Sequence, residues 1–583
     1  MQIFSNSQIL STTSLARLNR IVLFFLSVCL FSLISNVCLN AESNVPVRAK
    51  KGMVVSASSY ASEVGIDILK KGGNAIDAAV ATGFALAVTH PSAGNIGGGG
   101  FMVIHLKDGL NTTIDFRETA PLSAFRDMYL DSNKNVIENK SLKSMSASGV
   151  PGSVDGLLYA LQKYGTMSLE EVIQPAILLA EQGFTPDYRL VEFINKYNNH
   201  FNVYESSEKI FTDKGNLLSE DSIIVLKDLA KTLSIIKEKG REGFYSGEVA
   251  EAIVKTSNLY NGFITLDDLE NYSSFERNPV FGNYKGYEII SMAPPSSGGI
   301  AVIEALNILE NYNLQKDDWG SSNYIHLLVE TLRRVYADRS KHLGDPDFYP
   351  VPVTELISKD FAYKWFNTID TNIASVSSEI LPSNIMYDES PETTHYSVYD
   401  KYGNAVSTTV TLNSSFGNKI VVEGYGFLMN NEMDDFSSKP GVPNQFGLVG
   451  SEANSIAPTK RMLSSMTPTI VMKDNQPVLI VGSPGGSTII TTVLQVIINV
   501  IDFKMNIQEA VDAPRIHHQW LPDRIDYERF SFSNDTKSNL LKMGHNLGEQ
   551  TNLGRAQCIL IDLENNLIWG ASDPRGFGTA IGF

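Results

Sequence analysis

Hydrophobic residues recur with a helical period through much of the first two thirds of the chain. Apolar side chains three and four residues apart fall on one face of a helix. The pattern predicts helices over five ranges: Ser58–Lys71, Asn74–Val88, Ser153–Lys163, Ser168–Gln182 and Tyr324–Arg339. Asp345-Pro346-Asp347 and the largely polar segment 375–394 then interrupt the pattern. We therefore expect the chain to be mostly helical up to about residue 390.

A different period begins at Thr393. Between Thr393 and Ser415, two runs rich in β-branched and aromatic residues flank the segment Asp400–Asn404, which contains a glycine. Alternation on both sides of such a turn predicts a β-hairpin. Considered alone, it is an ordinary hairpin at the edge of a sheet. Strands dominate from there to the C terminus, with one predicted helix at Thr488–Ile501.

The N terminus has the order of a secretory signal peptide. Residues 1–20 contain Arg17 and Arg20 but no acidic residue, Ile21–Ile34 is almost wholly apolar, and the small residue Ala41 follows. The apolar run is shorter than the ~20 residues that span a bilayer comfortably. We expect residues 1–41 to be a signal peptide that directs a secreted or periplasmic protein. An uncleaved N-terminal membrane anchor is the alternative.

The composition is that of an acidic globular protein. The formal net charge is −17, with 43% hydrophobic and 19% charged residues. A negative chain disfavours nucleic acid and anionic membrane surfaces as partners. Of the three cysteines, Cys29 and Cys38 would leave with the signal peptide, and Cys558 lies in an apolar run that predicts a buried strand. No internal disulfide is expected.

Common cofactor and metal motifs do not fit. The glycine run Gly97–Gly100 lacks the Lys-Ser/Thr ending of a P-loop and the dinucleotide spacing, so we interpret it as a tight backbone turn. The chain has no His-Glu-x-x-His and no Gly-x-Ser-x-Gly motif. His517 and His518 are adjacent, so on a strand they would point to opposite faces. We expect neither a metal nor an organic cofactor.

Seven short motifs, taken in order, resemble those of the bacterial γ-glutamyltransferases, which are N-terminal-nucleophile hydrolases. They are Asn95–Phe101, Asp115–Pro121, Pro294–Gly299, Thr393–Ser397, Asn431–Phe436, Leu463–Met466 and Gly482–Ser487. The resemblance extends from about Lys50 to the C terminus. It implies an α/β fold, a four-layer αββα sandwich, and a precursor cut between Glu392 and Thr393 into a large subunit (42–392) and a small subunit (393–583).

The resemblance also implies an activity. A γ-glutamyl group would pass from glutathione or a related amide to water, or to an amino acid or dipeptide, through a γ-glutamyl ester of Thr393. Cutting before Thr393 creates an α-amino group with an unperturbed pKa of about 7.7–8.0, which can take the proton of the threonine hydroxyl. By resemblance, Thr411 hydrogen-bonds this hydroxyl. Gly485 and Gly486, before a helix N terminus, would stabilise the oxyanion.

A γ-glutamyl donor also carries an α-carboxylate and an α-ammonium. A guanidinium can bind a carboxylate bidentately, and by resemblance Arg117 does so with Ser464 and Ser465. Glu432 and Asp435 would face the ammonium, assisted by Asn413. Without the resemblance, the same residues would be interpreted as a solvated arginine, two turn serines and an exposed acidic loop.

Two positions depart from the family pattern, and two rival functions stay open. Glu392 stands where an amide residue is commoner, and Phe446 replaces a tyrosine found in some relatives in the loop Lys439–Gly450, which resembles a lid. The first rival is a relative that acts on cephalosporin side chains or on poly-γ-glutamate. Arg117 and the serine pair argue against it, because they imply a free α-carboxylate. The second is a periplasmic amino-acid-binding protein that uses the same polar groups without chemistry.

Overall fold

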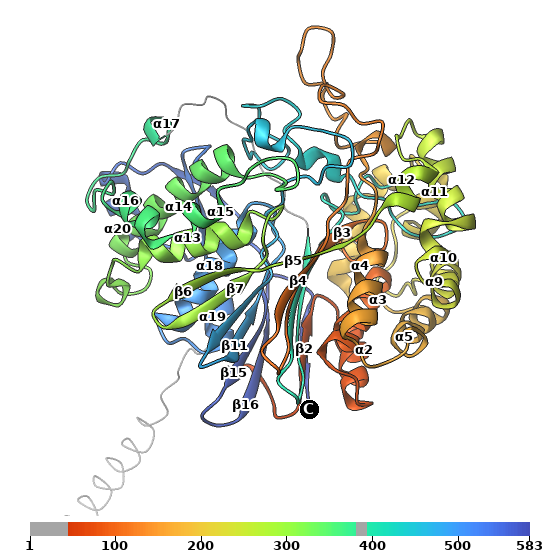
Figure 1. Cartoon of the computed structure of the whole chain (residues 1–583), viewed down its shortest axis with the longest axis horizontal. Helices are drawn as coiled ribbons and strands as arrows, with labels where there is room; N and C mark the ends of the chain where they lie inside the picture. Colours follow the sequence, from red (N-terminus) through yellow and green to blue (C-terminus); the bar gives the residue numbers. More distant parts are fainter. Residues whose placement is uncertain (1–44, 381–392) are drawn as a thin grey trace, which may run out of the picture. The chain divides into compact units, whose positions relative to one another are not determined.

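Two antiparallel sheets of seven strands each pack against one another at the centre of the fold (Figure 1). This computed structural model describes residues 45–380 and 393–583, and Pro46–Phe583 form one compact unit. The first sheet has the order β1 (Val47–Ala49), β16 (Leu567–Ser572), β15 (Gln557–Asp562), β11 (Gln476–Val481), β10 (Thr469–Lys473), β7 (Tyr287–Ser291) and β6 (Val280–Tyr284). The second has the order β17 (Thr579–Gly582), β2 (Met53–Ser56), β8 (Thr394–Tyr399), β9 (Ala405–Thr411), β3 (Gly99–His105), β4 (Asn111–Phe116) and β5 (Phe275–Arg277).

Helices cover the outer face of each sheet, which completes four layers (Figure 1). On the second sheet lie α2 (Ser59–Lys70), α3 (Ala75–Thr89) and α4 (Ser153–Tyr164), with α5 (Leu169–Gln182) outside α3. On the first sheet lie α13 (Gly298–Leu309) and α19 (Ile507–Asp512), with α18 (Thr488–Ile501) against both helices and α14 (Ser322–His342) outside α13. The arrangement is the predicted αββα sandwich.

Shorter elements complete the described chain. The remaining α-helices are α6 (Tyr188–Lys196), α7 (Asn198–Phe201), α8 (Glu205–Phe211), α9 (Lys227–Lys239), α10 (Glu242–Tyr245), α11 (Gly247–Leu259), α12 (Leu266–Asn271), α15 (Val353–Leu356), α16 (Lys359–Phe366), α17 (Ser377–Ile380) and α20 (Asn534–Lys542). Four 3₁₀ turns are η1 (Met145–Ala147), η2 (Leu314–Asp317), η3 (Glu432–Asp435) and η4 (Glu452–Asn454). A small third sheet joins β12 (Ile516–His517), β13 (Ile525–Tyr527) and β14 (Leu547–Gln550).

Burial explains why the central helices form where they do. Every residue of α3 is buried, and the Asn74 side chain caps the helix by accepting the backbone N–H groups of Ile76 and Asp77. The apolar side chains of α3 join a core cluster with the outer face of the second sheet. A second cluster fills the space between the sheets and under α13 and α18. These two cores are the main hydrophobic contribution to the fold.

The predicted helices correspond to α2, α3, α4, α5, α14 and α18, and the predicted hairpin is β8 with β9. Its predicted place at a sheet edge was wrong. β8 pairs with β2 on one side and β9 pairs with β3 on the other, so both strands are interior. Cys558 is fully buried in β15, as predicted, and burial raises the pKa of its thiol.

The mostly helical prediction for the first part of the chain missed seven strands, β1 to β7. Three of the missed pairings join that part to the C-terminal part: β2 with β8, β3 with β9, and β7 with β10. β3 is buried along its whole length, so its sequence lacks the alternation that marks a half-exposed strand. The parts before and after Thr393 are therefore interleaved in one fold.

Two predictions fall outside the described residues. The predicted signal peptide, residues 1–41, falls within residues 1–44, and Glu392, on one side of the predicted cut, falls within residues 381–392; the structure describes neither range. Among the helices that the structure describes, none combines the length and apolar composition needed to span a bilayer.

Candidate active site

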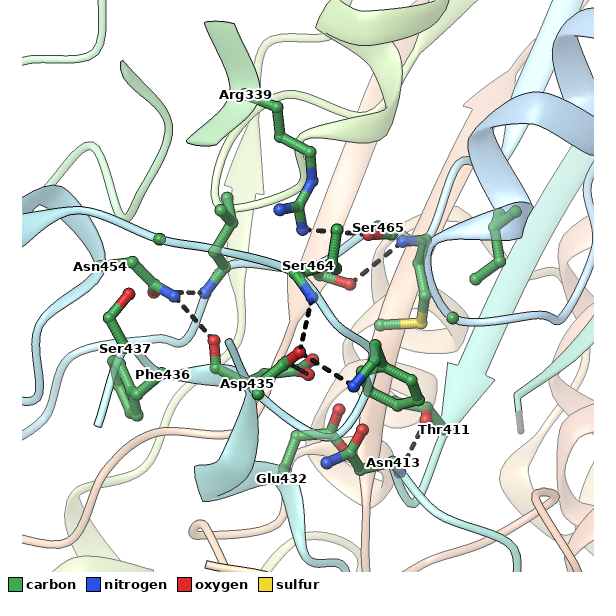
Figure 2. Close-up of a pocket in the computed structure, with 18 of the residues that line it drawn as sticks. Arg339, Thr411, Asn413, Glu432, Asp435, Phe436, Ser437, Asn454, Ser464 and Ser465 are labelled. Atoms are coloured by element: carbon green, nitrogen blue, oxygen red, sulfur yellow. Dashed lines mark hydrogen bonds between the residues drawn. The ribbon is translucent and has the colours of Figure 1, made fainter. Parts of the chain in front are cut away.

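A cavity of about 30 Å³ lies beside Thr393, the residue immediately before β8. Nine other residues singled out by the sequence line it: Arg117, Thr411, Asn413, Glu432, Asp435, Phe446, Ser464, Ser465 and Gly486. Figure 2 labels Thr411, Asn413, Glu432, Asp435, Ser464 and Ser465. Gly485 adjoins the cavity through Gly486. The strand registers explain part of this convergence, because β8 begins, β9 ends and β4 ends at the same end of the second sheet. The cavity has room for one or two water molecules.

Arg117 follows the last residue of β4 and is fully buried. One terminal nitrogen of its guanidinium is ion-paired with Glu432 and the other with Asp435. Its Nε donates to the carbonyl oxygen of Met462 at 3.3 Å. The sequence analysis assigned the arginine and the two acids to opposite ends of a ligand. In the structure they contact one another directly.

Glu118 adds a third buried carboxylate to this cluster. It lies 3.6 Å from Arg117, and neither of its carboxylate oxygens has a hydrogen-bond partner within the described parts of the chain. Burial raises the pKa of Glu118 to about 7, and burial also raises the pKa values of Glu432 and Asp435. Burial by itself disfavours the charge of Arg117, but the three acids together raise its pKa. The arginine therefore stays charged while the acids compete for its single positive charge.

A second buried arginine, Arg339, lines the cavity from α14. Its Nη2 donates to the Ser465 hydroxyl at 3.0 Å (Figure 2), and its Nε donates to the Ser297 hydroxyl at 2.9 Å. Ser464 is held through its backbone: its N–H donates to the Pro295 carbonyl at 2.9 Å. The serine pair is thus positioned by the segment before α13 and by an arginine of α14.

Thr411 and Asn413 form a tight turn after β9. The Thr411 hydroxyl oxygen accepts the Asn413 backbone N–H at 2.8 Å, and Asn413 has a φ of 73°, which asparagine tolerates better than most residues. The Asn413 side chain donates to the Asn431 carbonyl at 2.9 Å. Gly98 packs directly on this turn: an added Cβ would lie 2.1 Å from the Thr411 carbonyl oxygen. The predicted tight turn over Gly97–Gly100 is found only in part, because Gly99 and Gly100 belong to β3 and Gly98 makes a close backbone approach.

Gly485 and Gly486 precede α18 with φ values of 139° and 55°. Their carbonyl oxygens accept from the backbone N–H groups of Thr488 and Ile489, which starts the helix. The hydrogen bonds among the described residues leave the N–H groups of both glycines without a protein acceptor. Donors at the N terminus of a helix favour negative charge, so this turn can stabilise an oxyanion beside Thr393.

The segment Lys439–Gly450 covers the cavity. Phe446 is 4% exposed, and its ring packs so closely on Gly486 that an added Cβ would lie 2.9 Å from the ring. Polar contacts hold the residues beside it. Ser414 donates to the Gln445 side chain at 2.7 Å, and the Gln445 backbone N–H donates to Asp434 at 3.0 Å. Because Phe446 has no hydroxyl, its own contact is apolar, and polar contacts of the neighbouring residues also hold this segment.

One group of residues elsewhere has the composition of a metal site. His326, Glu330 and His545 are buried and place their ligand atoms within 4.8 Å of one another. His326 Nδ1 and His545 Nε2 are, however, 2.7 Å apart and hydrogen-bonded to each other, and Glu330 is ion-paired with Arg333 and Arg334. The donors are thus occupied by protein partners, and two cations lie nearby. We infer no metal there.

Sequence reasoning missed several residues of the site. Arg339 was placed inside a predicted helix with no role, and Glu118 was part of a motif but received none. Asn454 joins two segments of the site: its side-chain amide donates to the Asp435 carbonyl at 2.7 Å and accepts the Leu463 N–H at 2.9 Å (Figure 2). The helical period could have placed Arg339 on the apolar side of α14, where an arginine is unusual. No local signal indicates Asn454.

Comparison with known proteins places the chain among characterised sequences. The sequence model of the family described as Gamma-glutamyltranspeptidase matches residues 61–583. The glutathione hydrolase proenzyme of Escherichia coli (strain K12) is 51% identical over 531 residues, which are 91% of each chain. The crystal structure of Helicobacter pylori γ-glutamyltranspeptidase is 48% identical with a TM-score of 0.56, and covers 59% of this chain and 96% of that chain. The crystal structure of cephalosporin acylase from Bacillus halodurans is 26% identical with a TM-score of 0.82. The match covers 94% of this chain and 98% of that chain.

Proposed function

This chain belongs to the gamma-glutamyltranspeptidase family, and we propose that it transfers the γ-glutamyl group of glutathione or related γ-glutamyl amides to water, an amino acid or a dipeptide. The group passes through an ester on Thr393. The observation that carries the proposal is the position of Thr393. This threonine immediately precedes the central strand β8 and lines a cavity together with a buried arginine, the carboxylates of Glu432 and Asp435, and a glycine turn. Those groups match the carboxylate, ammonium and amide of a γ-glutamyl donor.

The chemistry begins with the precursor. The Thr393 hydroxyl attacks the carbonyl carbon of the preceding residue, the peptide bond breaks, and residue 392 is left as an ester on Thr393 Oγ1. Water then hydrolyses this ester, which releases the carboxylate of residue 392 and leaves a free hydroxyl and a free α-amino group on Thr393. That amino group then takes the hydroxyl proton while Thr393 Oγ1 attacks the γ-carbonyl carbon of the donor. The negative oxygen of the tetrahedral intermediate faces the N–H groups of Gly485 and Gly486. The donor amine leaves with the proton, and an ester on Thr393 remains. Thr411 hydrogen-bonds and orients the attacking hydroxyl.

Donor binding requires the buried ion pairs to rearrange. Arg117 already has two acidic partners, so a donor α-carboxylate must share or replace them. The donor carries an ammonium on the same carbon, and this ammonium gives Glu432 and Asp435 a new cation as the carboxylate takes part of the guanidinium. Ser464, Ser465 and Asn413 supply the remaining hydrogen bonds. A zwitterion adds one positive and one negative charge, so the net charge of the buried site does not change when it binds. A ligand with a single charge would leave one buried group unpaired, so the exchange of partners favours a zwitterion.

Processing and export complete the proposal. Residues 42–392 and 393–583 form a large and a small subunit from one precursor, and residues 1–41 direct it out of the cytoplasm. The interleaving of β8 and β9 with β2 and β3 supports a processed protein that stays together after the cut, because both sheets contain strands from each side of Thr393. A proenzyme is also what the curated relatives are described as.

Thr393→Ala tests the function, with Thr393→Ser as the matched variant. The alanine variant should remain one polypeptide on a denaturing gel and release no product from a chromogenic γ-glutamyl anilide. The serine variant keeps an oxygen but loses the methyl group that restricts χ1, so it should mature slowly and react at a reduced rate. Mass spectrometry should locate a γ-glutamyl adduct on residue 393 of the wild-type protein. A processed, active alanine variant would exclude Thr393 as the nucleophile.

The anilide assay also distinguishes the proposed function from that of the rival enzyme. A relative that acts on cephalosporin side chains does not depend on a free α-carboxylate next to the reacting amide. Poly-γ-glutamate keeps its α-carboxylates but has no free α-ammonium at internal residues, so a donor with a blocked α-amino group distinguishes that relative. We expect anilides that lack the α-carboxylate to react poorly, because Arg117, Ser464 and Ser465 would lose their ligand. Equal reaction of both anilides would favour the rival.

A further inference from the structure

Thr393 separates two cavities. The first is the pocket of Figure 2. The second, which we call the rear cavity, measures about 10 Å³ and shares Thr393 but no other described residue with the first. Its polar lining comes from His90, Thr394, His395, Arg555 and Gln557. A volume of about 10–15 Å³ is the minimum that holds one water molecule.

Two buried oxygens in this lining have no protein partner. Thr394 Oγ1 and Gln557 Oε1 make no hydrogen bond within the described parts of the chain, and the two residues are 0% and 1% exposed. An unpaired buried polar atom is costly, and such atoms in a small polar cavity are usually satisfied by water. Thr394 belongs to β8 of the second sheet and Gln557 to β15 of the first, so the rear cavity is lined by both sheets beside the nucleophile.

Three residues of the rear cavity also line an outer cavity nearer the protein surface. This outer cavity of about 180 Å³ shares Ala57, His90 and Phe577 with the rear cavity. We call these three residues the neck. The outer cavity is also lined by Thr185 and Asp187, which are exposed. Water that passes the neck would reach Thr393 without crossing the segment Lys439–Gly450, because no residue of that segment lines either cavity.

The neck is neutral and partly apolar. His90 Nε2 lies 3.3 Å from the Ser92 hydroxyl, and its ring packs on Phe577 with centroids 6.2 Å apart. Burial, together with the charge of Arg555, lowers the pKa of His90 to about 3. A neutral, partly apolar neck opposes the entry of charged amino acids and dipeptides, which are also too large for the rear cavity, whereas a water molecule fits there.

We propose that the rear cavity is a water site and that it supplies the water which hydrolyses the γ-glutamyl ester on Thr393, with Thr394 and Gln557 as the residues that position this water. The inference rests on the proposed function. In the step, the water oxygen bonds to the γ-carbonyl carbon and one water proton passes to the Thr393 α-amino group. The bond from that carbon to Thr393 Oγ1 then breaks, the proton moves to Oγ1, and free glutamate leaves.

The inference has a consequence for specificity. Amine acceptors must enter through the donor pocket after the leaving group has departed, whereas water arrives through the neck. Hydrolysis and transfer then use different routes to one ester. Changes in the rear cavity should alter hydrolysis without altering transfer at saturating acceptor.

Three variants test the water site: Thr394→Val and Gln557→Met remove the unpaired oxygens with little change of volume, and Ala57→Leu fills the neck. Ser59→Leu is the control, because Ser59 is exposed and lines the outer cavity alone. The measurement is the ratio of free glutamate to γ-glutamyl dipeptide formed from one donor. Loss of one hydrogen bond to the water should lower the rate of hydrolysis by about fivefold. Transfer should stay within about twofold, and Ser59→Leu should match the wild type in both rates.

Several outcomes would overturn the inference. Unchanged hydrolysis in Thr394→Val and Ala57→Leu would exclude the route, and an equal fall of hydrolysis and transfer would indicate a structural role only. Subunit bands and the γ-glutamyl adduct on Thr393 are measured first in each variant, so that a processing defect in Thr394→Val is recognised. If that variant is defective in processing, the hydrolysis rate of Ala57→Leu tests the route. If the wild-type protein forms no adduct, the proposed function fails. If the adduct forms and its partition is insensitive to the rear cavity, this inference alone fails.

Discussion

The fully buried guanidinium of Arg117 is ion-paired with Asp435, whose side chain is 13% exposed, although the two residues are far apart in the sequence and were expected to bind opposite charges of a ligand. With Glu432 on the other terminal nitrogen, the pocket contains a ready set of charged groups. A zwitterionic donor can exchange partners with this set, whereas a singly charged ligand would leave one buried charge unpaired. This relationship gives a physical basis for selecting a free α-amino acid group.

Arg117→Lys should lower kcat/KM for a γ-glutamyl anilide by more than about tenfold, because an ammonium cannot contact Glu432, Asp435 and a donor carboxylate with the planar fork of a guanidinium. The matched control is Arg126→Lys, since Arg126 is exposed and ion-paired with Glu452 at the surface. Steady-state kinetics of both variants decide the matter. Similar values for Arg117→Lys and the control would remove Arg117 from donor binding.

Arg339→Met should raise KM for the donor by about tenfold, because Ser465 and Ser297 lose a charged hydrogen-bond donor and the serine pair loses its orientation. Arg333→Met, on the same helix but outside the pocket, controls for the loss of a buried arginine. Thermal unfolding should show destabilisation in both variants. A donor KM that changes equally in both would show that Arg339 has no special role.

Phe446→Tyr should change the ratio of hydrolysis to transfer. The ring packs on Gly486, beside the proposed oxyanion site, so a phenolic hydroxyl must find a partner or displace the segment that covers the cavity. The ratio is measured at saturating dipeptide, with Phe348→Tyr as the control because Phe348 is 47% exposed. An unchanged ratio would mean that this segment does not control acceptor entry.

Asp434 should make stability depend on pH. Burial raises its pKa to about 7, against opposing hydrogen bonds from Ser141 and Gln445. Between about pH 4 and pH 7 the folded protein therefore binds a proton that the unfolded chain has lost, so the free energy of unfolding falls as the pH rises through this window. Asp434→Asn should show a smaller loss of Tm between pH 5 and pH 8 than the wild type. A Tm difference as large as that of the wild type would contradict the raised pKa.

Much of this protein could be predicted from short stretches of sequence. The helical period indicated α2, α3, α4, α5, α14 and α18 close to their observed bounds, because amphipathic or capped helices carry their signal locally. Ordered motifs indicated the family, and with it the four layers and the residues that meet beside Thr393. β-Branched alternation indicated the hairpin of β8 and β9 but not its neighbours.

Tertiary structure decided what depends on residues far apart in the chain. Strand pairing placed β8 inside the sheet, because its edges are covered by β2 and β9 and not by anything visible in its own sequence. Burial brought Arg117 into contact with Glu432 and Asp435, and a helix more than two hundred residues from Arg117 added Arg339. The rear cavity is likewise the space left between β8 and β15, strands from opposite sheets. Local sequence determines the preferred backbone conformation of each segment. Packing of distant segments determines which polar groups are removed from water at the same place and must therefore pair with one another.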